Sequence, residues 1–404
     1  MKSNQRRTGA VSGMNRTYRG ARIGAMYGTA GKKKPARRGL SARLIMILGG
    51  VALAALLAVA LSYAMAGVGR SDVGRVTRLG ATLNQNVVPF GDSVVFYDGM
   101  TLHCVSSSGG NEWSYQIGTK AYYDATDEHI VAWSGNDVYM LNRHGRLVFN
   151  DNLSDSIQFA SAGEDYVAVF IGEQDNGVIN VMNAEGQIVD NITIENQTVL
   201  DMGFFKSPTT TSTQETELLW VLGLNTTGTV ISTELQTFQP GKLVTGKSSL
   251  GEHIAYSVYF AGDRLHVVDT RQIGHYNYRV LEQETPTLIY GYTLKDVLHQ
   301  KKTTYQLLIP SQEEDKGVSF TNVRLMYDDV DRMLHLPGPC SYALLGSRSV
   351  YAFSGNAVYV CRYGDTAFTA YAMPVHVTTV LGMLDGDRVV VGSGSEIYVV
   401  ELPG

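Results

Sequence analysis

The stretch Gly91-Asp92-Ser93-Val94-Val95-Phe96 joins a tight-turn signal to a run of strand-forming residues. Glycine and aspartate suit a turn, whereas valine and phenylalanine favour a β-strand. The same pattern of turn and β-run begins again at Asp127, Gly163, Gly262, Gly346 and Gly386. The first three copies are 36 residues apart, and the following gaps of 99 and 84 residues each have room for one more copy. We place these two at Glu217–Val221 and Thr304–Ile309, which makes eight repeats.

Each repeat continues beyond this first β-run. A second run follows after a turn, most clearly at Asp137–Leu141, Ala357–Cys361 and Glu396–Val400, and a weaker outer run often follows it, as at Glu112–Gln116. Units of about 36–50 residues with about four strands are typical of β-propeller blades, which pack radially and expose only short strand edges. We therefore expect an all-β fold, a β-propeller of about eight four-stranded blades, with seven blades as the alternative.

The two ends of the repeat region are expected to meet. After Leu381 the last unit offers two good strands and stops at Gly404, so it lacks an outer strand. The run Arg75–Leu79 supplies a strand of suitable character. We therefore predict a propeller over residues 72–404 that is closed by N- and C-terminal strands in one blade.

This pattern resembles the eight-bladed quinoprotein-like and WD40-like propellers. More specifically, it is similar to the single-span, membrane-anchored propeller proteins of Gram-positive, Clostridia-type bacteria. The resemblance covers roughly residues 44–404 and depends on repeat texture and topology, so it implies a fold and a place in the cell envelope but no functional residue. Quinoprotein dehydrogenases usually hold their quinone with adjacent cysteines, a tryptophan platform and a Ca²⁺ site. This chain has no adjacent cysteines and only Trp113, Trp133 and Trp220, so we assign no cofactor.

A membrane span is predicted at Leu44–Gly67. This stretch has 24 residues without a charge or a proline, and a helix of that length spans roughly 36 Å, enough for a hydrocarbon core of about 30 Å. Residues 1–43 contain twelve Lys and Arg and no Asp or Glu, and they have too few apolar residues to form a core, so we expect a disordered tail. Basic segments beside a span stay on the cytoplasmic side. The sequence thus predicts a single-pass protein with residues 68–404 outside the cytoplasm.

Three alternatives concern this N-terminal region. A basic tail can also bind nucleic acid, but the span already accounts for the charge, so we expect no nucleic-acid partner. Ala64-Met65-Ala66 resembles a signal-peptidase site, yet the apolar run and the region before it are longer than in a signal peptide, which favours an uncleaved anchor. Small residues recur every four positions from Gly50 to Ala66, which suits a homodimer through the span or follows simply from the abundance of alanine.

The cysteines and histidines indicate no metal or redox chemistry. Cys104, Cys340 and Cys361 form no C-x-x-C pair, and we read them as buried thiols, with a bridge between Cys340 and Cys361 as the alternative. The nine histidines are scattered without a zinc-binding spacing. The acidic run Asp328–Asp331 is interpreted as a solvated turn, with a divalent-cation site as the alternative.

Other polar segments also lack a clear chemical role. Gly241–Ser248 matches the phosphate-loop pattern G-x-x-x-x-G-K-S, but strand-like residues follow where a helix is required, so we reject nucleotide binding. The polar segments Ser207–Thr216 and Ser311–Lys316 are predicted to be surface loops, the first of them within the fourth blade. The sequence therefore designates no catalytic, cofactor-binding or metal-binding residue.

These observations favour a membrane-anchored extracytoplasmic β-propeller that acts as a binding or scaffold module for an envelope protein, a glycan or a small ligand. Two alternatives remain: a propeller enzyme, either a quinone-type oxidoreductase or a carbohydrate-active one, and a sensor that signals through its single span. The 23 tyrosines suit a binding face, but Tyr139, Tyr359 and Tyr398 repeat at one blade position, which favours packing between blades.

Overall fold

The computed structural model of this chain describes residues 73–404 apart from 127, 210–211, 228, 243 and 312–318. The predicted span Leu44–Gly67, the basic tail and most of the predicted loop Ser311–Lys316 lie outside the described residues. Among the described residues there is no helix long and apolar enough to cross a membrane.

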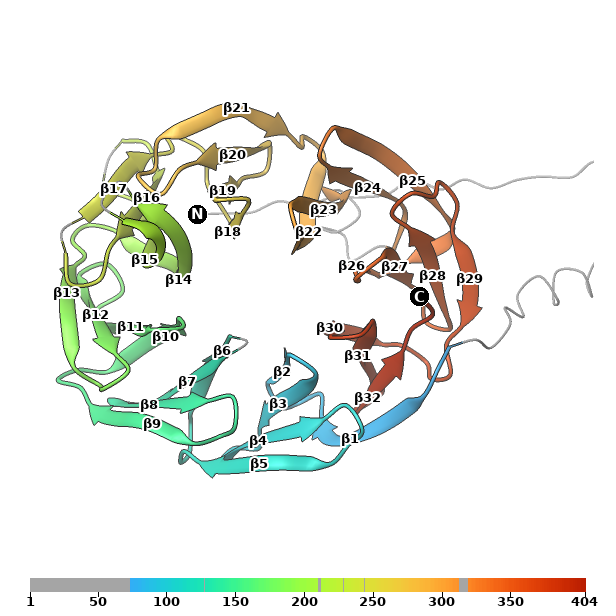
Figure 1. The fold of residues 1–404 in the computed structure, drawn as a ribbon, viewed down its shortest axis with the longest axis horizontal. Helices are drawn as coiled ribbons and strands as arrows, with labels where there is room; N and C mark the ends of the chain where they lie inside the picture. The colour runs from blue at the N-terminus through green and yellow to red at the C-terminus, as the bar shows by residue number, and fades with distance from the viewer. Residues whose placement is uncertain (1–72, 127, 210–211, 228, 243, 312–318) are drawn as a thin grey trace, which may run out of the picture. The chain divides into compact units, whose positions relative to one another are not determined.

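The described chain forms eight four-stranded antiparallel sheets, which are the blades of a propeller with the first strand of each blade nearest the centre (Figure 1). Blades 1 to 4 contain β2 (Val87–Phe90), β3 (Ser93–Tyr97), β4 (Thr101–Ser106) and β5 (Asn111–Gln116); β6 (Tyr122–Ala125), β7 (His129–Ser134), β8 (Asp137–Asn142) and β9 (Leu147–Asn152); β10 (Ile157–Ala162), β11 (Tyr166–Gly172), β12 (Gly177–Asn183) and β13 (Ile188–Thr193); and β14 (Thr198–Thr209), β15 (Ser212–Asn225), β16 (Ser232–Phe238) and β17 (Val244–Ser249).

Blades 5 to 8 contain β18 (Ser257–Ala261), β19 (Arg264–Val268), β20 (Gln272–Tyr276) and β21 (Glu282–Leu288); β22 (Tyr292–Gln300), β23 (Thr303–Pro310), β24 (Phe320–Tyr327) and β25 (Val330–Cys340); β26 (Tyr342–Leu345), β27 (Ser349–Phe353), β28 (Ala357–Arg362) and β29 (Thr369–Ala372); and β30 (Thr379–Leu384), β31 (Arg388–Ser393), β32 (Glu396–Glu401) and, from the start of the chain, β1 (Val76–Thr82). The predicted eight-bladed, all-β fold is therefore confirmed, and the alternative of seven blades is wrong.

The eight β-runs found in the sequence correspond to the second strands of the eight blades. In β3, β7, β11 and β31, four or more consecutive residues are buried, whereas the outermost strand β5 has no buried residue. A second strand is buried on both faces because the sheets of the two neighbouring blades pack against it. Such a strand is continuously apolar rather than alternating, which makes it the easiest strand to recognise in the sequence.

The turns that join the first and second strands explain why several repeats begin with Gly-Asp. Gly262 and Asp263 have φ values of 58° and 63°, and Gly386 and Asp387 have 75° and 54°. Two successive residues with positive φ suit a tight hairpin, and glycine and aspartate tolerate that conformation best. Equivalent strands run in the same direction around the ring, so these turns lie on one face, which we call the inner-turn face.

Strand β1 completes blade 8 at the position that the sequence analysis assigned to it. It pairs antiparallel with β32, with Val76 opposite Val400 and Thr77 opposite Val399. Leu79 and Ala81 are each only 3% exposed, and they belong to a core cluster shared by blades 8 and 1. The two ends of the propeller are therefore joined by both a hydrogen-bonded ladder and a shared apolar core.

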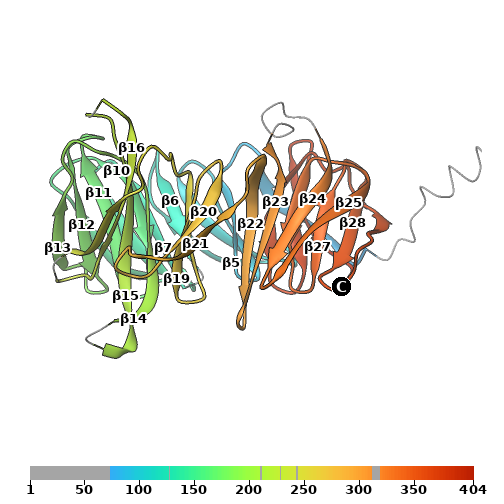
Figure 2. The same ribbon diagram turned by 90° about the horizontal axis from the view of Figure 1, so that it is seen from above.

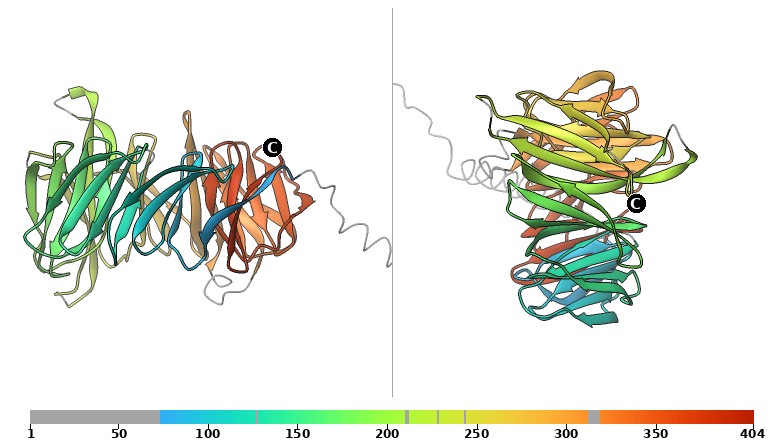
Figure 3. Two further views of the ribbon diagram at one scale, coloured as in Figure 1. Left: turned by 90° about the horizontal axis from the view of Figure 1, so that it is seen from below. Right: turned by 90° about the vertical axis from the view of Figure 1, so that its left-hand side faces the viewer.

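The prediction of a loop at Ser207–Thr216 is wrong. The segment lies within blade 4, as expected, but β14 extends to Thr209 and β15 begins at Ser212, with Ser207 opposite Thr216 and Pro208 opposite Glu215. This hairpin projects beyond the other blades in the side views (Figures 2 and 3). Its threonines favour strand structure, but the segment lacks the apolar alternation that would have marked it as β.

The cysteines and the repeated tyrosines have structural roles. Cys104, Cys340 and Cys361 are all buried and free, so the alternative of a Cys340–Cys361 bridge is not realised. Tyr139, Tyr359 and Tyr398 lie on the third strands β8, β28 and β32, where each is half-buried against a core cluster.

Candidate functional site

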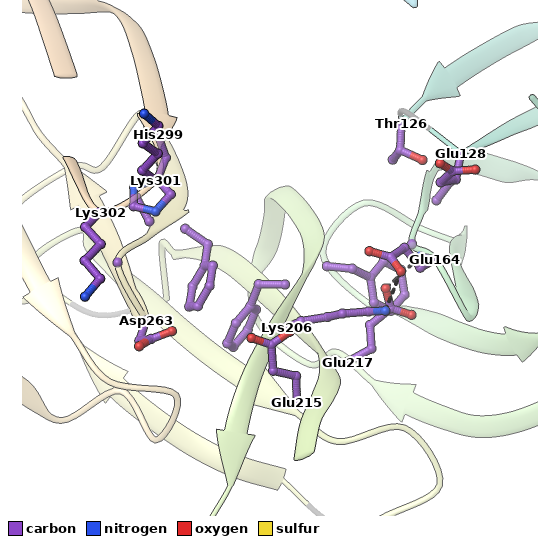
Figure 4. Close-up of a pocket in the computed structure, with 17 residues that line it drawn as sticks. Thr126, Glu128, Glu164, Lys206, Glu215, Glu217, Asp263, His299, Lys301 and Lys302 are labelled. Carbon is purple, nitrogen blue, oxygen red and sulfur yellow. Dashed lines mark hydrogen bonds and ion pairs between the residues drawn. The ribbon is translucent and has the colours of Figure 1, made fainter. Parts of the chain in front are cut away.

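A cavity of about 700 Å³ opens on the inner-turn face (Figure 4). Its lining comes from the turns of five successive blades: Thr126 and Glu128 from blade 2; Ala162, Gly163 and Glu164 from blade 3; Phe204, Phe205, Lys206, Glu215 and Glu217 from blade 4; Phe260, Ala261, Gly262 and Asp263 from blade 5; and His299, Lys301 and Lys302 from blade 6. Its size is in the range of small-molecule and cofactor sites. We call it the inner-turn cavity.

Part of the cavity lining is aromatic. The rings of Phe205 and Phe260 lie 4.9 Å apart, and Phe205 is buried in the core cluster between blades 4 and 5. Phe204 and Phe260 are half-buried and also line the cavity. These rings belong to the bases of the β14–β15 and β18–β19 hairpins, so an apolar surface continues from the core to the cavity.

The acidic side of the cavity is already occupied by internal bonds. The buried carboxylate of Glu217 accepts hydrogen bonds from the backbone N–H groups of Glu164, at 2.7 Å, and of Asp165, at 2.8 Å. Burial raises the pKa of Glu217 above its usual value, while these two donors act in the opposite direction. Lys206 forms ion pairs with Glu164 and, at 3.9 Å, with Asp165. We conclude that Glu217 and Lys206 hold the turn of blade 3 against blade 4.

The basic side differs, because its lysines form no ion pair within the described part of the chain. Lys301 and Lys302 form the exposed turn between β22 and β23, and Lys301 has a φ of 58°. Nδ1 of the neighbouring His299 lies 2.9 Å from Oγ1 of Thr304. In Figure 4, His299, Lys301 and Lys302 lie on one side of the cavity and Glu128 and Glu164 lie on the other. The cavity therefore offers the two lysines on one side, where Asp263 also lies, and an internally paired acidic cluster on the other.

The structure places the chemical motifs considered in the sequence away from this cavity. The phosphate-loop pattern ends in strand β17 rather than in a helix, and the backbone of Arg279 lies against Gly246, which agrees with the rejection of nucleotide binding. In the acidic turn Asp328–Asp331, Asp331 receives two hydrogen bonds from Arg324, at 2.8 and 2.7 Å. No group of three or more metal-ligating side chains occurs among the described residues.

The sequence pattern does not single out the residues of the cavity. Phe204–Lys206 lie in the first strand of blade 4, whereas the repeat pattern marks the second strands. Lys301–Lys302 lie in a turn that this pattern located only approximately. One signal was available: the eight repeats mark the turns before the second strands, and the polar and aromatic residues at those turns belong to a single face. Grouping the residues at these turns predicts that Glu164, Asp263 and Lys302 lie on the same face of the propeller.

A second polar cluster is buried within blade 5. His266 and His275 are opposite each other on β19 and β20, and their Nδ1 atoms lie 2.9 Å apart. Nε2 of His266 lies 3.1 Å from the carbonyl oxygen of Ala261, and Nε2 of His275 lies 2.9 Å from Oγ1 of Thr287. A carbonyl oxygen only accepts, so His266 carries its hydrogen on Nε2 and accepts from Nδ1–H of His275. Burial of both rings favours their neutral forms, and a further proton on Nδ1 of His266 would set two N–H groups against each other.

This histidine pair predicts a loss of stability in acid. Burial lowers the pKa of His266 to about 4, with His275 and Arg264 acting in the same direction and the Ala261 carbonyl and Glu284 opposing them; the pKa of His275 is also lowered by burial. The unfolded chain takes up protons first as the pH falls, so stability is complete above about pH 6.5 and decreases toward pH 4, by up to roughly 3 kcal/mol.

Urea denaturation between pH 4.5 and 7.5 would measure this effect. We expect the double variant His266→Gln/His275→Gln to show a shallower pH dependence than the unmodified chain. The variant His144→Gln, at an exposed histidine, should retain the original slope. Equal slopes in all three proteins would show that the pair does not control acid stability.

Comparisons with known proteins agree with this fold. No family model and no curated protein matches the sequence. Among solved structures, AztD from Citrobacter koseri is 10% identical, with 74% of this chain and 88% of that chain covered and a TM-score of 0.50. A eukaryotic initiation factor is 11% identical, with 80% and 85% covered and a TM-score of 0.50. BamB from Moraxella catarrhalis is 11% identical, with 82% and 97% covered and a TM-score of 0.47. At these identities the similarity shows the fold alone, and in fold the chain is a β-propeller.

Proposed function

We propose that this chain is a membrane-anchored, extracytoplasmic β-propeller that binds an envelope protein, a glycan or a small ligand at its inner-turn cavity. The observation that carries the proposal is the cavity itself, which five blades line and in which blades 4 and 5 contribute aromatic rings and blade 6 contributes two exposed lysines. A propeller fold serves many functions, so the argument depends on this site and not on the fold. Polar groups that converge on a concave, partly aromatic surface are typical of binding sites.

The proposed binding mode follows from the charges. The acidic side is largely neutralised by Lys206 and held by Glu217, so it is a preorganised surface that need not rearrange. Lys301 and Lys302 are exposed and extend from a hairpin turn, so they are free to engage an anionic group of the bound partner. An apolar part of the same partner would cover the rings of Phe204 and Phe260.

Site-specific photocrosslinking in the cells that make this protein would test the proposal. A photoreactive amino acid is placed at Lys302 in the full-length chain, which carries a tag at its N-terminus so that the C-terminus stays intact. The control position is Ile188, which is 44% exposed on β13, the outermost strand of blade 3. We expect a discrete adduct, identified by mass spectrometry, from Lys302 only. No adduct at Lys302, or the same adducts at both positions, would contradict binding at the cavity.

The anchored, extracytoplasmic placement is supported by the apolar span Leu44–Gly67 and the basic tail before it. It also agrees with the resemblance to single-span propeller proteins of Gram-positive bacteria. The three native cysteines are buried, so a cysteine introduced at Ile188 would be the accessible thiol among the described residues. A membrane-impermeant maleimide should label Ile188→Cys in intact cells. Labelling only after the cells are opened would place the propeller in the cytoplasm.

A further inference from the structure

A second cavity, of about 400 Å³, lies at the seam where the ring closes. It is lined by Arg75 and Thr77 at the start of β1, Ser107 and Ser108 in the β4–β5 turn, Gly386 and Arg388 beside the β30–β31 turn, and Val399 and Glu401 on β32. These residues are distant in sequence, and only ring closure brings them together. We call this the seam cavity.

Hydrogen-bond donors dominate the seam cavity. Arg388 donates from Nε to the carbonyl oxygen of Asp385, at 2.8 Å, and from Nη1 to Oγ of Ser107. Its Nη2 group and the whole guanidinium group of Arg75 have no partner within the residues that the structure describes. Glu401 is the one carboxylate in the lining, and its Oε2 already accepts from the backbone N–H of Arg75, at 3.4 Å.

This surplus of donors selects an anion. Two guanidinium groups line the cavity, that of Arg75 just before β1 and that of Arg388 on β31, together with Thr77, Ser107 and Ser108. A carboxylate has two oxygens, which a single guanidinium fork can saturate, whereas a phosphate group offers more acceptor oxygens in a tetrahedral arrangement. We propose that the seam cavity binds a phosphate group, carried either by a small phosphate ester or by a phospholipid headgroup.

Binding at this position would stabilise the closed ring. The bound phosphate would connect β1, blade 8 and the β4–β5 turn of blade 1 through Arg75, Arg388 and Ser107. A ligand that binds only the folded state raises its stability by mass action. Because the lining is complete only when β1 occupies blade 8, opening the seam would destroy the site. The proposal does not depend on binding at the inner-turn cavity.

Thermal unfolding of the full chain in neutral phosphatidylcholine nanodiscs would test this site, with inorganic phosphate and glycerol 1-phosphate as probes. We expect either saturating probe to raise the melting temperature by roughly 2–5 °C, with potassium chloride at the same ionic strength as the reference. Arg75→Ala should abolish this rise while leaving the unliganded melting temperature nearly unchanged, since its side chain is exposed. The matched control is Arg78→Ala, an exposed arginine on β1, three residues after Arg75, that pairs with Glu396, and it should retain the rise.

Nanodiscs that contain phosphatidylglycerol distinguish the two sources of phosphate. If a lipid headgroup occupies the site, these nanodiscs alone should raise the melting temperature of the unmodified chain but not of Arg75→Ala, and added phosphate should have little further effect. If the ligand is a soluble phosphate ester, lipid composition should make no difference and the probes should act as before. The proposal is overturned if neither probe nor lipid raises the melting temperature, if potassium chloride acts equally, or if Arg75→Ala responds like the unmodified chain.

Discussion

Replacing Leu79 by aspartate should lower the free energy of unfolding by about 4–5 kcal/mol, an effect large enough to detach the closing strand of the propeller. Leu79 is 3% exposed and packs in the cluster shared by blades 8 and 1, with Val94 and Val105 on one side and Val390 and Ile397 on the other. An aspartate there would remove this apolar contact and bury a carboxylate among side chains that cannot form hydrogen bonds with it. Because β1 joins the start of the propeller to its last blade, the loss affects the whole ring.

Urea denaturation of the full chain, followed by far-ultraviolet circular dichroism, would measure this loss. The matched control is Leu147→Asp, the same chemical change at a leucine that is 40% exposed on the outermost strand β9. That variant should remain within about 0.5 kcal/mol of the unmodified chain. If Leu79→Asp is too unstable to purify, Leu79→Ala should still lose about 2–4 kcal/mol. Equal stability of the Leu79 and Leu147 variants would mean that β1 does not hold the ring closed.

Replacing Gly246 by alanine should lower the free energy of unfolding by about 3 kcal/mol. A Cβ atom at this position would lie 2.3 Å from both the carbonyl carbon and the carbonyl oxygen of Arg279. These are backbone atoms of the β20–β21 connection in blade 5, so relief requires the two blades to separate. Nearby, Oγ1 of Thr237 donates a 2.7 Å hydrogen bond to the carbonyl oxygen of Tyr278, and the same separation would break it.

Gly364→Ala provides the control for this substitution. A Cβ atom at Gly364 has no neighbour within 4 Å, and Gly364 is not among the residues with positive φ. Its stability should therefore stay within about 0.5 kcal/mol of the unmodified chain. If the two alanine variants have the same melting temperature, blades 4 and 5 are not in close backbone contact. A selective loss of stability in Gly246→Ala would also explain the phosphate-loop pattern, because it would show that the second glycine of that pattern is required for packing between blades.

The sequence alone determined the β-propeller and its eight blades. Each second strand is buried on both faces, so runs such as Val94–Phe96 and Val389–Val391 are continuously apolar, and this signal is local. The Gly-Asp pair before several of these strands is local too, because a tight turn constrains its own two residues. The missing outer strand of the last unit, together with Arg75–Leu79, was enough to predict closure of the ring.

Only the tertiary structure decided where side chains meet. Lys206 and Lys302 are far apart in sequence, and they line one cavity because blades 4 and 6 turn toward the same face. Arg75 and Arg388 share the seam cavity only after β1 has paired with β32. The hairpin at Ser207–Thr216 took strand structure from its cross-strand partners, although its own residues resemble a loop. These contacts depend on ring closure and on strand register, which connect distant segments, whereas a pattern read along the chain reports only on the environment of neighbouring residues.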